Sequence, residues 1–290
     1  MAIGMNTNVA GTWKKITGAH TNVAGTWKEI TAGYQNVSGV WKKFYPASYE
    51  IDYSGSFSNA SNKYLTRLNS GTANNADKLT VSVWVKRAST GSRNIIGGGK
   101  KDNDNKAYCE FDSSNRLGFH FKRNEKWQCD MVTNATYTST TGWYHIHMLY
   151  DSNQATASNR FTLHVNGSLI NSAVSGNWVT YDLPGSSEAA RWCENGERTE
   201  WGAYTDNRSD TFDGLLANAY VLEGTLIAYT NFGETSGSSW VPIEYNTEPA
   251  GGLSSFLEFA NSSSLGADSW GNGTFTNYNS VTRSTTTPTS

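Results

Sequence analysis

The chain has 290 residues and a formal net charge of −2 at pH 7. This near-neutral balance gives no reason to expect nucleic-acid binding, and no run approaches the ~20 apolar residues of a membrane span. A high content of Gly, Ser, Thr, Asn, Tyr and Trp with only five Pro favours an all-β protein with many turns. The first residues also lack the apolar core of a signal peptide, which predicts synthesis in a cytoplasm without export.

Three nearly identical segments open the chain: NVAGTWKKI, NVAGTWKEI and NVSGVWKKF, starting at Asn8, Asn22 and Asn36. Their even period of 14 residues lets equivalent residues of an extended chain face one side of a sheet. The pattern predicts one short strand per copy and a very small sheet, which needs partners to cover its apolar face. The residues predicted to anchor or oligomerise the chain are Val9, Trp13, Val23, Trp27, Val37 and Trp41.

Residues 1–48 are basic, because five lysines face a single glutamate, so this arm is near +4 and the remainder of the chain near −6. A basic arm with tryptophans could bind phosphates or a membrane surface. Repeated lysines are more often the solvated face of a strand. We therefore expect neither nucleic-acid binding nor membrane insertion.

Short strand candidates recur after the repeats. In the first of them Val81, Val83 and Val85 share one face, and Ile146 lies on the equivalent apolar face of a later one. Strands with one apolar side need two sheets packed face to face. The candidates are residues 79–87, 94–98, 107–111, 116–121, 143–150, 160–167, 199–204, 212–222 and 254–260.

The order LTVSVWVKR, GWYHIHMLYD, RFTLHVNG and FDGLLANAYVLEG resembles the laminin-G-like, concanavalin A-like jelly roll. The resemblance covers about residues 49–228 and implies an all-β jelly-roll sandwich. We expect residues 1–48 to precede it as a small repeat-strand segment. Residues 229–290 would follow as an extension that packs on the jelly roll or on partners.

The tail contains TNFGETSGSSWVPIEYN, SSFLEFANSSSLGADSWGNGTFT and the closing TTTPTS. These motifs resemble the C-terminal part of bacteriophage tail-fibre and related virion proteins, which often also carry V-x-G-x-W-K repeats. Trp270 and Thr274 replace the usual small residue and Asn of those motifs, and Thr287-Pro288-Thr289 lacks the usual preceding Asp. These departures weaken the transfer of detailed contacts.

The resemblance implies a virion structural protein, as a tail or head fibre or a decoration subunit. Its expected partners are other virion proteins and copies of itself, with a trimer favoured, and it would reach the medium by lysis of the host. Its jelly roll could adhere to host-surface polysaccharide. The alternatives are an architectural cement protein that binds no sugar and, less favoured, a glycan depolymerase.

No enzyme motif is complete. Glu110 and Asp112 resemble the E-x-D-x-x-E strand of laminarinase-type glucanases, whose first and last glutamates are the catalytic pair, but the last position is Asn115. No G-x-S-x-G elbow, H-E-x-x-H or P-loop occurs. We therefore expect a binding or structural protein rather than an enzyme, with no cofactor.

Two weak metal candidates are present. His145, His147 and His164 could converge, but no fourth zinc ligand is evident, and solvated or hydrogen-bonded histidines on an outer face are the favoured interpretation. Asp102 and Asp104 offer oxygen ligands for calcium in a lysine-rich loop that lacks the EF-hand spacing. A solvated loop is the favoured alternative.

Aromatic residues are the remaining candidates for a binding site, because the eleven Trp and fifteen Tyr are more than a core of this size needs. An indole ring can stack on the C–H face of a sugar while neighbouring polar groups bond its hydroxyls. The tryptophans near polar residues, and therefore the candidate glycan contacts, are Trp84, Trp127, Trp192 and Trp201. Burial in the sandwich is the alternative for each of them.

The three cysteines, Cys109, Cys129 and Cys193, cannot all pair within one chain. Cys109 and Cys129 lie in strand-like runs that could be neighbours, so a disulfide between them is possible. Three reduced thiols are the favoured state for a protein assembled in a cytoplasm.

Overall fold

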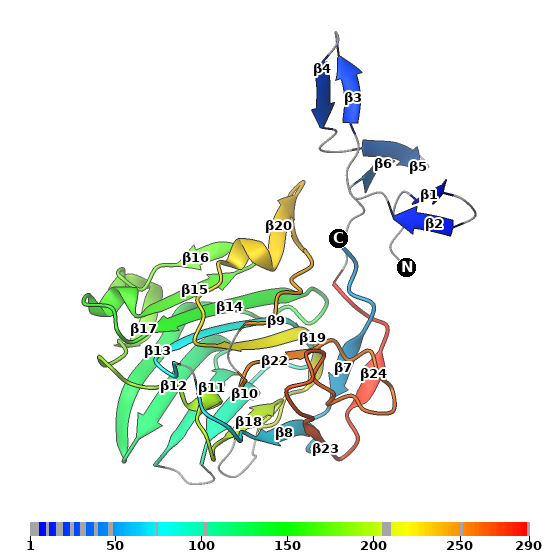
Figure 1. The fold of residues 1–290 in the computed structure, drawn as a ribbon. Coiled ribbons are helices and arrows are strands. Elements are labelled where there is room, and N and C mark those ends of the chain that lie inside the picture. Colours follow the sequence, from blue (N-terminus) through cyan, green and yellow to red (C-terminus); the bar gives the residue numbers. More distant parts are fainter. Residues whose placement is uncertain are drawn as a thin grey trace.

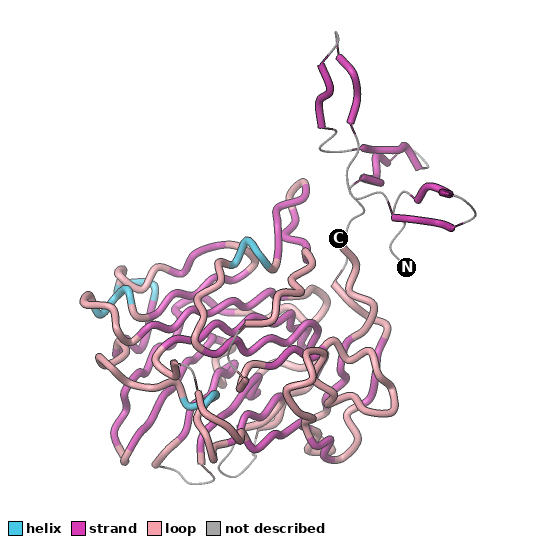
Figure 2. Tube along the Cα trace, in the orientation of Figure 1, coloured by secondary structure: helices cyan, strands magenta, loops and turns pink. Residues whose placement is uncertain are grey.

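The computed structural model is an all-β protein, as the sequence predicted, and Figure 2 shows strands and loops with only short helical turns. The helical turns are η1 (Ala157–Asn159), η2 (Ser175–Asn177), η3 (Arg191–Cys193) and η4 (Tyr229–Asn231). Among the described residues, no helix has the length and apolar character that crossing a membrane would require. The described residues are 6–9, 12–15, 20–23, 26–29, 33–37, 40–45, 49–73, 75–100, 104–204, 210–249 and 252–288, with side chains from residue 49 onward.

Two large antiparallel sheets form the body (Figure 1). Sheet A runs in the order β17 (Trp178–Asp182), β13 (Lys126–Thr136), β12 (Arg116–Arg123), β11 (Lys106–Phe111), β10 (Arg93–Gly99), β18 (Arg198–Trp201), β8 (Tyr64–Leu68) and β23 (Thr276–Tyr278). Sheet B runs in the order β16 (Ser168–Ile170), β15 (Phe161–Val165), β14 (Tyr144–Asp151), β9 (Lys78–Arg87), β19 (Gly214–Glu223), β7 (Ser54–Phe57) and β24 (Thr282–Ser284), and β22 (Ser255–Leu257) also pairs with β19. The architecture is that of a jelly-roll sandwich.

The core lies between the two sheets because each strand turns its apolar residues to the same side. Val83 of β9 and Ile146 of β14 pair directly and are 1% and 2% exposed. Phe119 of β12 meets Phe161 of β15 across the gap, with their ring centroids 5.1 Å apart. The alternation in the sequence therefore assigned the core face of these strands correctly.

The residues after β19 are part of the sandwich. β22 and β24 join sheet B and β23 joins sheet A, so the C-terminal extension supplies strands to both sheets. A separate hairpin of β20 (Gly233–Ser236) and β21 (Ser239–Pro242) lies against the outer face of sheet B, where Trp240 bonds to His145. This cover explains why the polar-looking face of β9 and β14 is buried.

The N-terminal repeats form hairpins, which corrects the prediction of one strand per copy. The pairs are β1 (Asn6–Val9) with β2 (Thr12–Lys15), β3 (His20–Val23) with β4 (Thr26–Glu29), and β5 (Gly33–Val37) with β6 (Val40–Tyr45). Each hairpin is a two-stranded sheet of its own, and together they do not make one small sheet. The Ala-Gly or Ser-Gly within each copy separates the two strands, and such two-residue links favour a hairpin.

The register is the same in all three hairpins. Asn8 pairs with Trp13, Asn22 with Trp27, and Asn36 with Trp41. The Val and the Trp of one copy therefore lie on different strands: Val9, Val23 and Val37 are on the first strand of their hairpins, and Trp13, Trp27 and Trp41 are on the second.

All three cysteines are buried and free. Cys109 lies on β11 and Cys129 on β13, and β12 runs between these strands. Two strand spacings amount to about 9.6 Å, beyond the Cα separation that a disulfide spans. The possible bridge between Cys109 and Cys129 is therefore excluded.

Candidate functional site

One row of residues crosses the outer face of sheet A from edge to edge. In β11, β12 and β13 the residues next to this row, Cys109, Phe119 and Met131, lie in the core, so the row itself points away from the core. Read from β17 to β23, the row is Asp182, Asp130, His120, Tyr108, Gly97, Glu200, Thr66 and Thr276.

Four rings gather around the middle of this row, and we call Tyr108, His120, Trp127 and Tyr204 the aromatic face. Tyr108 stacks on His120 with ring centroids 4.4 Å apart, and Tyr204 lies 5.2 Å from Tyr108. Trp127 stands across the end of the stack, 5.9 Å from His120 and at 60° to it. Its side chain is 40% exposed, so the face presents an open indole ring beside a packed stack.

Two lysines flank the aromatic face from the neighbouring row. Lys122 Nζ lies 5.7 Å from the ring centroid of Trp127, and Lys106 Nζ lies 4.9 Å from the ring centroid of Tyr204. Both contacts are within the range of cation–π attraction. Lys122 also lies 3.8 Å from Asp104, so the face carries charges of both signs.

His120 is fixed between two carboxylates. Its Nδ1 lies 2.8 Å from Asp130 Oδ1, whereas its Nε2 is 3.7 Å from Glu110 Oε1, too far for a direct hydrogen bond. Nε2 is buried and has no hydrogen-bond partner. Because this nitrogen is enclosed, His120 contributes to the face by holding Asp130 and the Tyr108 ring in place, and not by bonding a ligand through Nε2.

Burial raises the pKa of the Glu110 carboxyl, and the neighbouring carboxylates Asp112 and Asp210 raise it further, while His120 and a hydrogen bond from Ser92 lower it. Burial also raises the pKa of the Tyr108 hydroxyl, which therefore remains a neutral hydrogen-bonding group. The face thus offers polar groups at the edge of an apolar surface.

Gly118, on β12, makes room for the His120 ring. A Cβ at this position would overlap with His120 Nε2. The close approach of a ring to the backbone requires glycine here.

Only one of the four predicted glycan contacts is on the surface. Trp192 and Trp201 are fully buried in the core between the sheets, and Trp84 is 3% exposed on the covered outer face of sheet B. Their rings cannot stack on a surface sugar, so the prediction is wrong for these three. Trp127 is the exposed exception.

The glucanase-like pair is separated by the local fold. β11 ends at Phe111, and Asp112 caps the following turn by accepting from the backbone N–H of Ser114 and of Arg116. Its other oxygen pairs with the Arg116 side chain at 2.7 Å. Asn115 is in that turn with φ of 64°, so it does not continue the strand face of Glu110.

The three histidines of sheet B converge on its outer face and are buried, and His145 and His147 are hydrogen-bonded, which is one of the two predicted forms. His145 and His147 are 0% exposed and His164 is 8% exposed. Both ring nitrogens of His145 are engaged, by Trp240 and by Ser82. The C-terminal extension supplies the cover that the strand pattern could not reveal.

Of the two calcium candidates, only Asp104 can be placed, because Asp102 lies outside the described residues. The side chain of Asp104 is 46% exposed and faces Lys122. Within the described part of the chain, no group of three His, Cys, Asp or Glu side chains is arranged to hold a metal ion.

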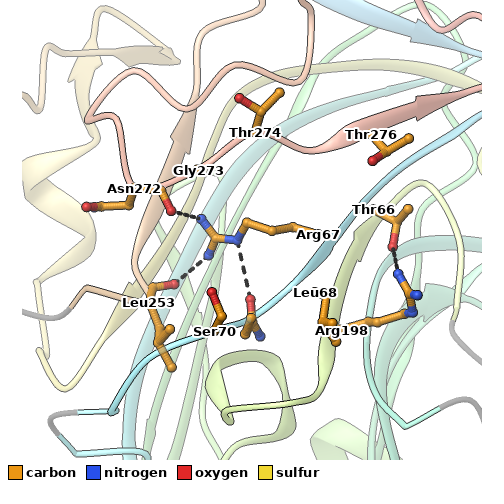
Figure 3. A pocket seen from close by; sticks show the side chains of 11 residues that line it. Thr66, Arg67, Leu68, Ser70, Arg198, Leu253, Asn272, Gly273, Thr274 and Thr276 are labelled. Carbon is orange, nitrogen blue, oxygen red and sulfur yellow. Dashed lines mark hydrogen bonds between the residues drawn. The ribbon is translucent and has the colours of Figure 1, made fainter.

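A polar hollow of about 250 Å³ lies at the β8–β23 end of sheet A (Figure 3). Arg67 is at its centre, and its guanidinium donates to the carbonyls of Leu253 at 2.7 Å and Asn272 at 3.5 Å. It also pairs with buried Asp268 at 3.3 Å. Because Arg67 is engaged on several sides by the C-terminal extension, we interpret this hollow as the joint that holds the extension on β8.

Tyr108, His120, Asp130 and Tyr204 were not selected as site residues from the sequence. The signal was present in part, because Tyr108 and His120 alternate with buried residues in AYCEF and RLGFHF. Their meeting depends on the register of β11, β12 and β13, which no single strand pattern gives.

Comparisons with known proteins agree with this architecture. The family model of the concanavalin A-like lectin/glucanases superfamily matches residues 59–229. No curated protein is significantly similar in sequence.

Several solved structures are similar to this chain at low sequence identity. A putative carbohydrate-binding protein from Bacteroides ovatus is 14% identical with a TM-score of 0.56, and the match covers 89% of this chain and 66% of that one. A heptameric SAP-like pentraxin from Limulus polyphemus is 16% identical with a TM-score of 0.44, covering 62% of this chain and 80% of that one. Tailspike protein 2 of an Escherichia coli O157:H7 bacteriophage is 11% identical with a TM-score of 0.38, covering 60% of this chain and 26% of that one.

The similarity to the Bacteroides ovatus protein, with its TM-score of 0.56, shows the fold alone. The family model, in contrast, matches more than half of the chain. The protein therefore belongs to the concanavalin A-like lectin/glucanases superfamily.

Proposed function

We propose that the protein is a bacteriophage virion structural protein whose jelly roll adheres to host-surface glycans through the aromatic face. The observation that carries the glycan proposal is the exposed Trp127 ring beside the Tyr108–His120 stack, edged by polar groups. A sugar ring would lay its C–H face on the indole. Its hydroxyls would then reach the carboxylates of Asp130 and Glu110.

The balance of charges favours an uncharged glycan. Asp104, Glu110 and Asp130 offset Lys106 and Lys122 around the rings. A strongly anionic polysaccharide would meet these carboxylates, so we expect recognition through stacking and hydroxyl hydrogen bonds. We also expect binding without cleavage, since Asp112 is committed to Arg116 and Asn115 is no acid.

The virion part of the proposal rests on the sequence likeness of the tail to phage fibre proteins and on the N-terminal hairpins. Each hairpin is a two-stranded sheet that pairs with neither large sheet, and an isolated hairpin is marginally stable in water. Docking on a virion scaffold or on sister chains, as a trimer, would supply the missing layer.

A purely architectural role is the second candidate. Four apolar side chains that are 38–52% exposed lie along the β16 and β17 edges of the sandwich, where neighbouring virion subunits could pack. They are Leu169, Val174, Val179 and Tyr181. In this role the chain would hold the particle together and bind no sugar.

Binding to arrayed host-surface polysaccharides separates the two roles. The adhesion proposal expects saturable binding by the full chain and a loss of about tenfold or more in Trp127→Ala, the size of effect typical of an interface hot spot. Tyr181→Ala is the matched control, because Tyr181 is also an exposed aromatic residue of sheet A. It pairs with the core residue Met131, so it lies on the opposite side of the sheet from the aromatic face. The architectural role would be favoured by two results together. The chain would bind no host polysaccharide, and Val179→Asp would lower the stability of the particle.

A depolymerase is tested in the same material. Incubation with the polysaccharide that binds should release no reducing ends. Release that stops in Glu110→Gln would replace the binding role by a catalytic one.

A further inference from the structure

A second hollow, of about 390 Å³, lies on the other side of the molecule, at the rim of sheet B. One wall is the turn between β15 and β16, and the other is η4 with the β20–β21 hairpin, which Figure 1 shows beside these strands. The hairpin follows residue 229, where the family match ends. The hollow is therefore built largely by the extension that this chain adds to the jelly roll.

Two aromatic rings line the hollow and are held rigidly. Trp240 and Tyr229 lie with ring centroids 5.6 Å apart at 34°. The Trp240 indole donates to His145 Nδ1 at 2.9 Å, and Tyr229 stacks on His164 at 4.0 Å. Because buried histidines fix both rings from below, the rings form a preorganised surface.

Two glycines allow this arrangement. A Cβ at Gly167 or at Gly233 would come within 2.5 Å of the Trp240 ring. The indole can therefore lie close against the backbone of both walls. This close seating keeps Trp240 from moving when a ligand enters.

Polar groups with spare hydrogen-bonding capacity surround the rings. Ser168, Thr230 and Thr235 are exposed and contribute hydroxyls. Asn166 uses its Oδ1 to accept from the backbone N–H of His145, so its NH₂ is the part available to donate to a ligand. Glu234 is the one charged side chain among the lining residues, all of which are described, and it is exposed.

We propose that this hollow is a second carbohydrate subsite that takes one uncharged hexose unit. Its volume is within the range of small-ligand sites, and rigid rings with convergent hydroxyl, amide and carboxylate groups suit a sugar with one apolar face. Glu234 would accept from sugar hydroxyls and repel a uronic acid. The inference goes beyond the proposed function, since the hollow lies on the opposite sheet from the aromatic face and shares no residue with it.

Two sites on one chain would raise the apparent affinity for a polysaccharide. The second contact becomes intramolecular once the first is made, which can strengthen weak single-site binding 10²-fold or more. Adhesion to a dense glycan layer would then need only weak affinity at each site.

The Trp240 indole N–H is a direct reporter for the test. The full chain is labelled with ¹⁵N-tryptophan, and the Trp240 signal is assigned with Trp240→Phe. Methyl glycosides of glucose, galactose, mannose and N-acetylglucosamine are then titrated, with galacturonate as the charged comparison. We expect a saturable shift of the Trp240 signal with at least one uncharged glycoside and binding at least tenfold weaker for galacturonate, a difference that Glu234→Gln should reduce.

Variants locate the effect. Thr235→Trp and Ser168→Trp fill the hollow from opposite walls and should abolish the shift. Ser236→Trp should leave it unchanged, because Ser236 is exposed on the same hairpin and does not line the hollow. A panel without any saturable shift, or a shift that survives both filling variants, would overturn the proposal.

The outcome is independent of the proposed function. Trp127→Ala removes the aromatic face and should leave the Trp240 titration unchanged. If polysaccharide binding depends on Trp127 while Trp240 never responds, the second subsite fails and the adhesion proposal survives. If Trp240 responds to a glycoside while polysaccharide binding does not depend on Trp127, the second subsite is supported and the aromatic face is not the adhesion site.

Discussion

Trp240, in the C-terminal extension, donates its indole N–H to Nδ1 of His145, in the middle of sheet B, over 2.9 Å. Because this nitrogen accepts, the ring carries its hydrogen on Nε2, which lies 2.8 Å from Ser82 Oγ. His145 is therefore neutral with both nitrogens bonded. The extension and the jelly roll are joined through an uncharged buried histidine, so they should unfold together.

The histidine cluster makes folding sensitive to acid. Burial lowers the pKa of His145 and of His164, and it lowers that of His147 to about 4. The unfolded chain takes up these protons near pH 6.5, whereas the folded chain does so only at lower pH. The stability contribution is therefore fully present above about pH 6.5 and is lost as the pH falls toward 4.

His147→Gln tests this contribution, because Gln can still donate to the Ile227 carbonyl that His147 bonds at 2.8 Å, but it does not titrate. Between pH 7 and pH 4, urea unfolding should show the wild-type protein losing up to about 3 kcal/mol more than the variant. Glu197 acts in the opposite direction, since burial raises its pKa to about 7, and its contribution is lost as the pH rises. That effect is common to both proteins and cancels in the difference. Equal pH dependence would show that His147 does not titrate as described.

Gly118→Ala should weaken glycan binding without unfolding the chain. The added methyl group overlaps with His120 Nε2, so the ring must move away from Asp130 and from the Tyr108 stack. A lost hydrogen bond of about 1 kcal/mol corresponds to roughly fivefold weaker binding in a polysaccharide titration. Gly176→Ala is the control, because nothing lies within 4 Å of a Cβ there. If Gly118→Ala bound the polysaccharide as tightly as the unchanged protein, His120 would not contribute to glycan binding.

Ile146→Ala should destabilise the sandwich by about 2–5 kcal/mol, because Ile146 is 2% exposed and packs between the sheets. Val179→Ala, at a side chain that is 47% exposed, should cost much less. Chemical denaturation of both variants measures the difference. Similar losses in the two variants would contradict the core assignment of β14.

Removing residues 1–44 should abolish self-association and leave the sandwich folded, because the hairpins pair with neither large sheet. Sedimentation equilibrium of the full chain and of the shortened chain gives their masses. We expect an oligomer, with a trimer favoured, for the former and a monomer for the latter. A full chain that stays monomeric at high concentration would refute an oligomerising role for the repeats.

Sequence patterns predicted the sandwich because its central strands alternate apolar and polar residues. Each of the nine strand candidates overlaps a strand of the structure, from β9 through β22. The edge strands β23 and β24, with the sequences TNY and TRS, carry no such alternation. They are strands only because β8 and β7 pair with them, which is a tertiary effect.

The site was less predictable for the same reason. The alternation within β14 places His145 on the polar face of that strand. In the structure this side chain is covered by Trp240, which lies 95 residues later in the chain. Trp192 and Trp201 have polar neighbours in sequence and still lie in the core. In the N-terminal repeats, each copy holds two paired strands, and an assignment of one strand per copy missed this.

The most direct measurement is a crystal structure of the full chain with an oligosaccharide derived from the host polysaccharide that binds most tightly. The adhesion proposal predicts a sugar ring stacked on Trp127, with hydroxyls bonded to the carboxylates of Asp130 and Glu110. A sugar bound elsewhere, with the outer face of β11–β13 empty at saturating concentration, would contradict it.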